Sequence, residues 1–404
     1  MKLSGPATEG VQHVAAPRGR DERSPVTTPA TTPAPPASTP LADAHAALGA
    51  SFTDFAGWQM PLRYASDLAE HHAVRRAAGI FDLSHMGEIR VSGPQAGAAL
   101  DAALAGRPSA MAIGRAAYGL LVDHEGGIVD DLVTYRLGEQ EFLVVANAAN
   151  VEPVVVALAD RARPFDAHVA DETARWALVA VQGPASAAIV GPLVDADLTA
   201  LGYYRCAPAT LTTGPGAPGV EVLLARTGYT GEDGFEVFVP VDDAVAAWDA
   251  LLAATREHGG VPAGLACRDT LRLEAGMPLY GHELTTATSP FAAGLGRVVK
   301  LDKDPGPVGL EALQRLAATP PARVLVGLRG TGRRAPRAGY PVVAGGSPVG
   351  EVTSGALSPT LGYPVAMAYV DAALSAPGTA LAVDVRGTEL PVEVVALPFY
   401  RRER

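Results

Sequence analysis

Apolar runs of strand length and mixed polar and apolar runs of helix length follow one another irregularly from Leu41 onward. A doubly wound parallel sheet requires a regular strand–helix–strand order, which this sequence lacks. Beyond Pro320 and Pro321 the pattern changes to short strand-like runs separated by Gly and Pro, typical of a small β barrel or sandwich. The pattern therefore predicts an α+β fold of mainly antiparallel sheets with a separate C-terminal β domain.

The first 40 residues differ in composition from the rest of the chain. They include the segment TTPATTPAPPASTP, which restricts the backbone without supplying apolar surface to bury. We expect a disordered tail over residues 1–40, two interleaved α+β domains over residues 41–318 and a β-barrel domain over residues 319–404. The tail has no apolar segment of the kind that a secretory signal needs.

The net charge and the cysteine content indicate which classes of ligand and which cellular compartment to expect. The formal net charge of −11 argues against binding to a phosphate backbone or an anionic membrane. The two cysteines, Cys206 and Cys267, are far apart, so neither a disulfide framework nor a cysteine zinc site is predicted. No run approaches the roughly 20 apolar residues of a membrane helix. We expect a cytoplasmic protein without a metal, a nucleic-acid partner or a membrane partner.

Three helices can be predicted from their boundary residues. One follows a Ser66 cap and stops at Gly79, a second covers 244–258 and stops at Gly259, and a third covers 265–275 and stops at Gly276. Scattered Met and aromatic side chains such as Phe55, Phe81 and Met86 are interpreted as core rather than as pocket.

The segment YGLLVDHEGGIVDDLVTY, residues 118–135, predicts a β hairpin. Gly126 and Gly127 supply a tight turn between two apolar runs, and Asp130 and Asp131 open the second strand. Because adjacent strand residues point to opposite faces, one carboxylate can face inward while the other faces solvent or a neighbouring turn. Either both acids cap the turn, or the inward one belongs to a functional site.

The segment RTGYTGEDGFEVFV, residues 226–239, has three glycines in a second predicted hairpin. Such an irregular loop permits close approach of a ligand to the backbone. We interpret Glu232 and Asp233 as an acidic surface turn. Glu236 differs, because an acid within the apolar run FEVFVP needs a partner if it faces inward.

Arg268 and Arg272 lie four residues apart on the third predicted helix and share one face. They can hold a carboxylate ligand, or they can form internal salt bridges with Asp269 or Glu274. The sequence has no dinucleotide-binding glycine motif, phosphate loop, serine elbow or His-Glu-x-x-His zinc motif. The sequence therefore gives no motif evidence for nucleotide binding, serine-hydrolase activity or zinc-protease activity.

Taken together and in order, these segments resemble the glycine cleavage T protein family, the aminomethyltransferases. The resemblance runs from about Ala42 to Arg402. The matching motifs are FAGWQMP, AVRRAAGIFDLSHMGEI, YGLLVDHEGGIVDDL, VVANAAN, ALVAVQGP, RTGYTGEDGFE, CRDTLRLEAG and VTSGALSPTLG. Any one motif is moderately specific, whereas the ordered set is highly specific.

The resemblance implies three domains in a clover-like ring around a central folate pocket. It implies transfer of an aminomethyl group from the lipoyl arm of the H protein to tetrahydrofolate, with release of ammonia and formation of 5,10-methylenetetrahydrofolate. Asp131 would contact N10 of the folate, acting by positioning and electrostatics more than as a base. The residues that would line the folate pocket are Tyr118, Asn147, Tyr204, Tyr229, Glu236, Arg268 and Tyr400.

The chain departs from the family pattern between the pocket and the barrel. Where the family usually reads Pro-x-Glu-x-Gly-Leu followed by Trp, this chain has Ala292 and Arg297 in place of the acid and the aromatic residue. Residues 300–309 also lack the usual Asp-Phe-x-Gly. These departures leave open another tetrahydrofolate-dependent one-carbon transferase or demethylase. A non-catalytic folate-binding iron–sulfur assembly factor is less well supported, because its Lys-Gly-Cys segment is absent.

Overall fold

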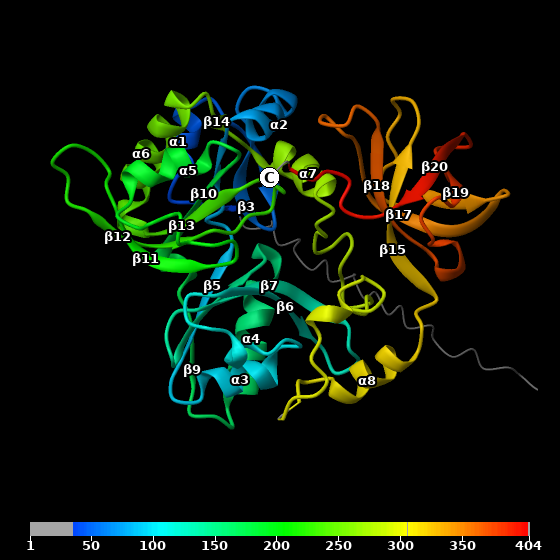
Figure 1. Cartoon of the computed structure of the whole chain (residues 1–404), viewed down its shortest axis with the longest axis horizontal. Helices are drawn as coiled ribbons and strands as arrows, with labels where there is room; N and C mark the ends of the chain where they lie inside the picture. Colours follow the sequence, from blue (N-terminus) through cyan, green and yellow to red (C-terminus); the bar gives the residue numbers. More distant parts are fainter. Residues whose placement is uncertain (1–34, 305, 403–404) are drawn as a thin grey trace, which may run out of the picture. The chain divides into compact units, whose positions relative to one another are not determined.

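The computed structural model describes residues 35–304 and 306–402, which form two large sheets with flanking helices and a closed C-terminal barrel (Figure 1). The expected α+β class with mainly antiparallel sheets is confirmed. None of the helices in these residues is long and apolar enough to cross a membrane. Residues 1–34, most of the predicted tail, lie outside the described residues.

The end of the predicted tail belongs to the fold. β1 (Ala37–Ser38) pairs in parallel with β3 (Trp58–Arg63), which also pairs with β2 (Ser51–Phe55). Thr39 is buried, and its hydroxyl donates a hydrogen bond to Asp82 at 2.7 Å. The packed chain therefore begins before Leu41, because these residues find partners that composition does not reveal. α1 (Ala42–Ala47) follows directly.

A six-stranded sheet carries the segment with three glycines. In spatial order its strands are β11 (Cys206–Leu211), β12 (Val220–Ala225), β13 (Gly234–Pro240), β10 (Trp176–Gln182), β4 (Gly79–Asp82) and β14 (Val261–Pro262). β14 is parallel to β4, and the other neighbours are antiparallel. The helices α5 (Ser186–Val190) and α6 (Ala244–Glu257) pack against it, with Trp248 fully buried in the shared core.

Between β4 and β10 the chain builds a five-stranded antiparallel sheet. In spatial order its strands are β6 (Ala116–Val122), β7 (Ile128–Arg136), β8 (Glu141–Ala146), β5 (Gly87–Ser92) and β9 (His168–Asp171). The helices α3 (Ala96–Ala103) and α4 (Val151–Ala162) share an apolar core with it, which includes Phe142 and Leu158. The two sheets are thus interleaved in sequence.

The C-terminal β domain is a closed barrel rather than a sandwich. Around the barrel its strands are β15 (Arg323–Gly330), β18 (Pro364–Asp371), β17 (Ser347–Leu357), β16 (Pro341–Ala344), β19 (Ala380–Asp384) and β20 (Glu389–Val395). α8 (Leu310–Ala318) precedes it in the chain (Figure 1).

Three of the predicted helix boundaries can be checked closely. α2 (Asp67–Arg76) is capped by Ser66, whose Oγ accepts a hydrogen bond from the Ala69 amide at 3.3 Å. Gly79 does not stop this helix, which ends at Arg76, but begins β4. Glycine is required there by close packing, because a Cβ at Gly79 would come within 2.5 Å of Val74. α7 (Leu265–Glu274) ends as predicted before Gly276, whose φ is +65°.

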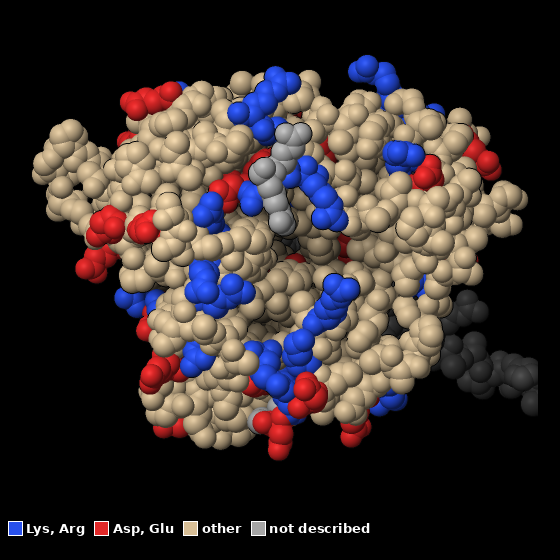
Figure 2. Space-filling model, viewed as in Figure 1, with Lys and Arg blue, Asp and Glu red and all other residues tan. Residues whose placement is uncertain are grey.

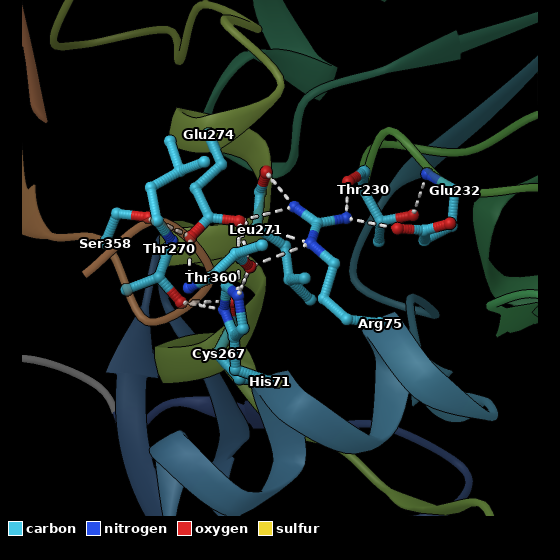
Figure 3. Close-up of polar contacts among 11 residues, drawn as sticks. His71, Arg75, Thr230, Glu232, Cys267, Thr270, Leu271, Glu274, Ser358 and Thr360 are labelled. Atoms are coloured by element: carbon cyan, nitrogen blue, oxygen red, sulfur yellow. Dashed lines mark hydrogen bonds and ion pairs between the residues drawn. The ribbon is translucent and has the colours of Figure 1, made fainter. Parts of the chain in front are cut away.

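A buried polar cluster, the Glu274 junction, connects α2, α7, the loop after β12 and the loop after β17 (Figure 3). Arg75 donates to Glu274 at 2.8 Å and to Glu232 at 2.9 Å. Thr360 donates from its backbone amide at 3.0 Å and from its hydroxyl at 2.7 Å to the Glu274 carboxylate, which also accepts from the Ser358 hydroxyl. Residues far apart in sequence are therefore joined by one carboxylate.

The Glu274 junction also corrects a prediction. Glu232 is not part of an acidic surface turn, because it is only 7% exposed and paired with Arg75. Asp233 is partly buried and forms a two-pronged ion pair with Arg226, at 3.0 and 2.6 Å. The interpretation considered neither the distant Arg75 nor the pairing of Asp233 with Arg226 at the start of the same segment.

We expect the Glu274 junction to make stability depend on acid pH. Burial alone would raise the pKa of Glu274, but the hydrogen bond and charge of His71 and the charge of Arg75 lower that pKa to about 2. A depressed carboxyl pKa stabilises the fold above the unfolded pKa and loses that contribution as pH falls towards 2. The shift corresponds to at most about 3 kcal/mol.

Glu274→Gln should therefore unfold at lower denaturant concentration than the wild type at pH 7, and the difference should shrink as pH falls from about 4.5. Glu393→Gln, which removes an exposed barrel pair with Arg329, is the matched control and should show little difference at any pH. A Glu274→Gln deficit that stays constant with pH would contradict this account.

Candidate functional site

A cavity of about 440 Å³ lies between the two sheets and α7. Of the eight predicted site residues, the structure brings seven to its lining, from both sheets, their loops and α7: Tyr118, Asp131, Asn147, Tyr204, Tyr229, Glu236 and Arg268. Among the described residues the barrel strands contribute no lining side chain. The barrel instead supports the site from behind, where Leu273 of α7 packs against Val365 and Met367.

The two adjacent acids on β7 have different surroundings. Asp130 is fully buried away from the cavity, where its carboxylate accepts from the Asn147 amide groups and from Asn150 at 2.6 to 3.1 Å. Asp131 lines the cavity and accepts from the Tyr118 hydroxyl at 3.0 Å and from the Asn147 side chain at 2.9 Å. Strand alternation therefore leaves one carboxylate, that of Asp131, facing the cavity.

Burial makes both acids harder to ionise. It raises the pKa of Asp131 to about 6, although the hydrogen bonds from Tyr118 and Asn147 oppose the rise. Burial and, second to it, the charge of Asp131 raise the pKa of Asp130 to about 7. Asp131 thus keeps a carboxylate near neutral pH while being a stronger base than an Asp in water.

A second carboxylate, Glu236, lies on β13 at another wall of the cavity. The hydroxyl groups of Thr227 and Tyr135 donate hydrogen bonds to the same oxygen, Oε2. These donors hold Glu236 within its apolar strand and leave the other oxygen, Oε1, available to a ligand.

Arg268 is the cation of this cavity without a carboxylate partner in the described chain. Its guanidinium lies 4.9 Å from the centre of the Tyr229 ring, and its buried Nη1 has no hydrogen-bond partner there. Arg272 behaves otherwise, because it pairs with Asp269 at 2.7 Å and with Glu283 at 3.0 Å. The predicted internal salt bridge is thus found for Arg272, whereas Arg268 is left for a ligand.

Tyr204 has an uncommon backbone conformation for a residue of its size, with φ at +58°. Its carbonyl accepts from the Ala116 amide of β6 at 2.9 Å, and its own amide donates to the Arg226 carbonyl at 3.0 Å. These bonds tie the loop before β11 to both sheets and direct the ring towards the cavity.

Tyr400 does not line this cavity. Its ring packs under the Arg75 guanidinium at 4.0 Å, and its amide donates to the Glu274 carbonyl at 2.8 Å. The structure therefore places Tyr400 at the Glu274 junction, and its folate contact stays a prediction. The segment LPFYRR carries no local signal that distinguishes these two positions.

Several lining residues were not predicted. Phe55 lines the cavity rather than the core, which corrects its interpretation. Met86 lines the cavity and also packs against a buried core cluster, and Phe81 is buried core as expected. His85 is 2% exposed, with no partner for Nδ1 among the described residues, and burial lowers its pKa to about 4. Its neighbours in FDLSHMGEI gave no reason to separate a cavity-facing His from a core one.

The residues that the structure describes contain no group of three or more His, Cys, Asp or Glu side chains arranged to hold a metal ion. Besides the Arg272–Asp269 pair, the polar groups that line the cavity include the carboxylates of Asp131 and Glu236, the guanidinium of Arg268 and several phenols. Such a lining can accept and donate hydrogen bonds to a flat polar ring and stabilise positive charge.

We expect the buried, ionised Asp131 side chain to lower the folding stability of the protein. A folded-state pKa raised above the unfolded value means that ionised Asp131 costs stability above about pH 6, by at most about 3 kcal/mol. Asp131→Asn should therefore be as stable as the wild type at pH 8 or more stable, with the advantage fading as pH falls below 6. Thermal and denaturant unfolding measure this, with exposed Asp371→Asn as control. Lower stability of Asp131→Asn at pH 8 would contradict it.

Comparisons with known proteins agree with this architecture. Residues 41–303 match the GCVT N-terminal domain, and residues 323–401 match the glycine cleavage T-protein C-terminal barrel domain. An aminomethyltransferase of Saccharopolyspora erythraea is 59% identical, covering 91% of this chain and 99% of that protein. One from Symbiobacterium thermophilum is 45% identical, covering 90% and 97%.

A solved structure resembles the whole described fold. The glycine cleavage system aminomethyltransferase T of Bartonella henselae matches with a TM-score of 0.82 and 36% identity, covering 90% of this chain and 98% of that one. The matches extend over both sheets and the barrel. The chain therefore belongs to the glycine cleavage T-protein family of aminomethyltransferases.

Proposed function

We propose that the cavity binds tetrahydrofolate and that Asp131 lies at its reacting nitrogens. In this proposal the enzyme takes the aminomethyl group from the dihydrolipoyl arm of the H protein, releases ammonia and forms 5,10-methylenetetrahydrofolate. The observation that carries the proposal is the Asp131 carboxylate, held by Tyr118 and Asn147 in a largely apolar cavity. Such a group stabilises a developing cation far better than a solvated carboxylate does.

Glu236 and Arg268 suit the two kinds of polar edge on a pterin ring. The amide and amino groups of the ring offer donors to the Glu236 carboxylate, and the ring carbonyl offers an acceptor to Nη1 of Arg268. The aromatic side chains Tyr118, Tyr204 and Tyr229 supply flat apolar surface beside the ring system. The hydroxyl groups of Thr227 and Tyr135 orient the Glu236 carboxylate without Arg268, which favours a direct contact of Arg268 with the ligand.

The proposed reaction moves one carbon from the thioaminal to the two reacting nitrogens of tetrahydrofolate. Loss of the dihydrolipoyl thiolate from the thioaminal leaves an iminium carbon, which N5 of tetrahydrofolate attacks. The nitrogen N5 loses its proton, ammonia leaves as N10 closes the ring, and N10 loses its proton in turn. Asp131 stabilises the cationic carbon and accepts a proton from the folate nitrogens. Its raised pKa gives this proton transfer more weight than the reference value for Asp suggested.

The partners and the compartment follow from the same proposal. We propose the lipoylated H protein as the donor of the one-carbon unit. We also propose the reducing cytoplasm as the compartment, because Cys206 and Cys267 are buried free thiols.

The central test compares wild type with Asp131→Asn in an assay of tetrahydrofolate, aminomethylated H protein and release of ammonia. We expect the variant to bind tetrahydrofolate measurably but to form methylenetetrahydrofolate at least about a hundredfold more slowly, as for loss of a group that acts in the transition state. The exposed variant Asp371→Asn should retain full turnover. Unchanged turnover of Asp131→Asn would remove Asp131 from the mechanism, and no ammonia release by wild type would favour another one-carbon transferase.

The acid side of the pH–rate profile offers a further prediction. Because catalysis needs ionised Asp131, kcat/KM should fall as pH decreases through about 6, where the pKa of Asp131 lies in the free enzyme. Steady-state rates between pH 5 and pH 8 measure this, given saturating H protein. A profile that stays flat to about pH 4, the ordinary range for Asp, would contradict the role of the buried carboxylate.

A further inference from the structure

Three histidine side chains are buried within residues 35–304 and 306–402: His45, His71 and His85. Both ring nitrogens of His45 lie 2.9 Å from a side-chain oxygen, and those of His71 lie 2.7 and 2.8 Å from one. His85 differs, because it is 2% exposed and its Nδ1 has no hydrogen-bond partner in this part of the chain. Buried polar atoms are rarely left unpaired in a native structure, so we expect the missing partner on a ligand.

His85 lies on the wall of the 440 Å³ cavity. It belongs to the segment that crosses from β4 of the six-stranded sheet to β5 of the five-stranded sheet. The Leu83 amide donates to the Leu178 carbonyl at 2.8 Å, and the Ser84 hydroxyl accepts from the Leu178 amide at 3.1 Å. Because these bonds attach the crossing segment to β10, the His85 ring has a defined position on the wall.

An aromatic neighbour orients the ring further. The Phe55 and His85 rings meet edge to face, with their centres 5.4 Å apart and an angle of 88° between their planes. Phe55 also lines the cavity. The contact covers part of the imidazole with apolar surface, so water competes less for its ring nitrogens and a hydrogen bond to a ligand gains strength.

The His85 imidazole is neutral at neutral pH. Burial, above all, lowers the pKa of His85 to about 4, the charge of Asp82 opposes this fall, and the charge of Arg268 adds to it. Figure 2 shows Lys and Arg side chains gathered around the hollow near the middle of the face in view. A positive field of this kind also disfavours a cationic imidazole.

A neutral imidazole has one N–H donor and one lone pair that accepts. Asp82 is buried behind the cavity wall, whereas Arg268 lines the cavity. Electrostatics therefore favour the tautomer whose N–H faces Asp82 and whose lone pair faces the cavity.

We propose that His85 is a specificity-determining residue that accepts a hydrogen bond from a ring N–H of the ligand and thereby selects a reduced pterin ring. The proposal rests on the proposed function, because the ring in question is that of bound tetrahydrofolate. The amide, amino and carbonyl groups assigned to Glu236 and Arg268 are the same in reduced and oxidised folate. Only the reduced ring carries N–H groups at N5 and N8. The oxidised ring would leave the His85 lone pair unpaired, and unpaired buried groups are a strong source of discrimination.

The experiment compares the dissociation constants of tetrahydrofolate and of 5,8-dideazatetrahydrofolate, in which CH₂ groups replace both N–H groups while the ring stays reduced. The wild type should bind tetrahydrofolate at least about tenfold more tightly than the analogue. His85→Phe should reduce this preference by about tenfold, through weaker binding of tetrahydrofolate, while its affinity for the analogue changes little. Asp131 also meets N5 in the proposed function, so the change in preference between wild type and variant is the measured quantity. The exposed variant His168→Phe on β9 is the matched control and should keep the preference.

Three variants at this position separate ligand binding from folding. His85→Phe replaces a buried unpartnered ring by an apolar one of similar size, so thermal stability should be unchanged or higher. His85→Asn and His85→Gln place an amide oxygen near the positions of Nδ1 and Nε2, and one of them should recover part of the preference. Loss of the preference accompanied by lower stability in all three variants would assign His85 to the fold and overturn the proposal.

Nitrogen-15 NMR of the histidine rings gives a readout that does not depend on turnover, with the His85 signals identified by their absence from His85→Phe. We expect a neutral ring between about pH 6 and pH 8, and a shift of one ring nitrogen on binding of tetrahydrofolate but not of the analogue. An unchanged preference in a stable His85→Phe, or equal nitrogen shifts with both ligands, overturns the role of His85 and leaves the proposed function standing. Failure of the wild type to bind either ligand contradicts the proposed function and the role of His85 with it.

Discussion

The Glu274 carboxylate and its ion pair with Arg75 hold together the parts of the molecule that form the site. Glu274 ends α7, Arg75 lies on α2, and Ser358 and Thr360 belong to the loop that leaves the barrel strand β17. α7 in turn places Arg268 and Arg272 on the cavity wall. Removing one partner of such a buried pair leaves the other charge without compensation, so the cavity depends on contacts that it does not itself contain.

Asp131 and Arg268 in the cavity, in contrast to the charged groups of the Glu274 junction, are not stabilised by an ion pair with each other. Asp131 is held by Tyr118 and Asn147, yet burial makes its ionised form costly, and Arg268 remains without an anionic partner in the described chain. A structural ion pair would place two such charges together. In this cavity the Asp131 carboxylate and the Arg268 guanidinium do not pair with each other and can each bind a group of the ligand, as expected for residues whose partners are on the substrate.

Features fixed by neighbouring residues could be predicted from the sequence. The Ser66 cap, the end of α7 before Gly276 and the hairpin that carries Asp131 depend on local backbone preferences. Features fixed by distant partners could not. The turn residue Glu232 is buried because Arg75 lies 157 positions away in sequence, and Phe55 faces a cavity whose other walls come from later segments. The ordered motifs predicted seven residues that line one cavity, but they did not separate Tyr400 from this set or indicate His85.

The most direct measurement of the central claim is a crystal structure of Asp131→Asn, a slow enzyme that should retain the ligand, bound to tetrahydrofolate. The account predicts the pterin ring between Glu236 and Arg268, with N10 within hydrogen-bonding distance of the residue 131 side chain. Folate bound outside this cavity, or bound with its reacting nitrogens directed away from position 131, would contradict it.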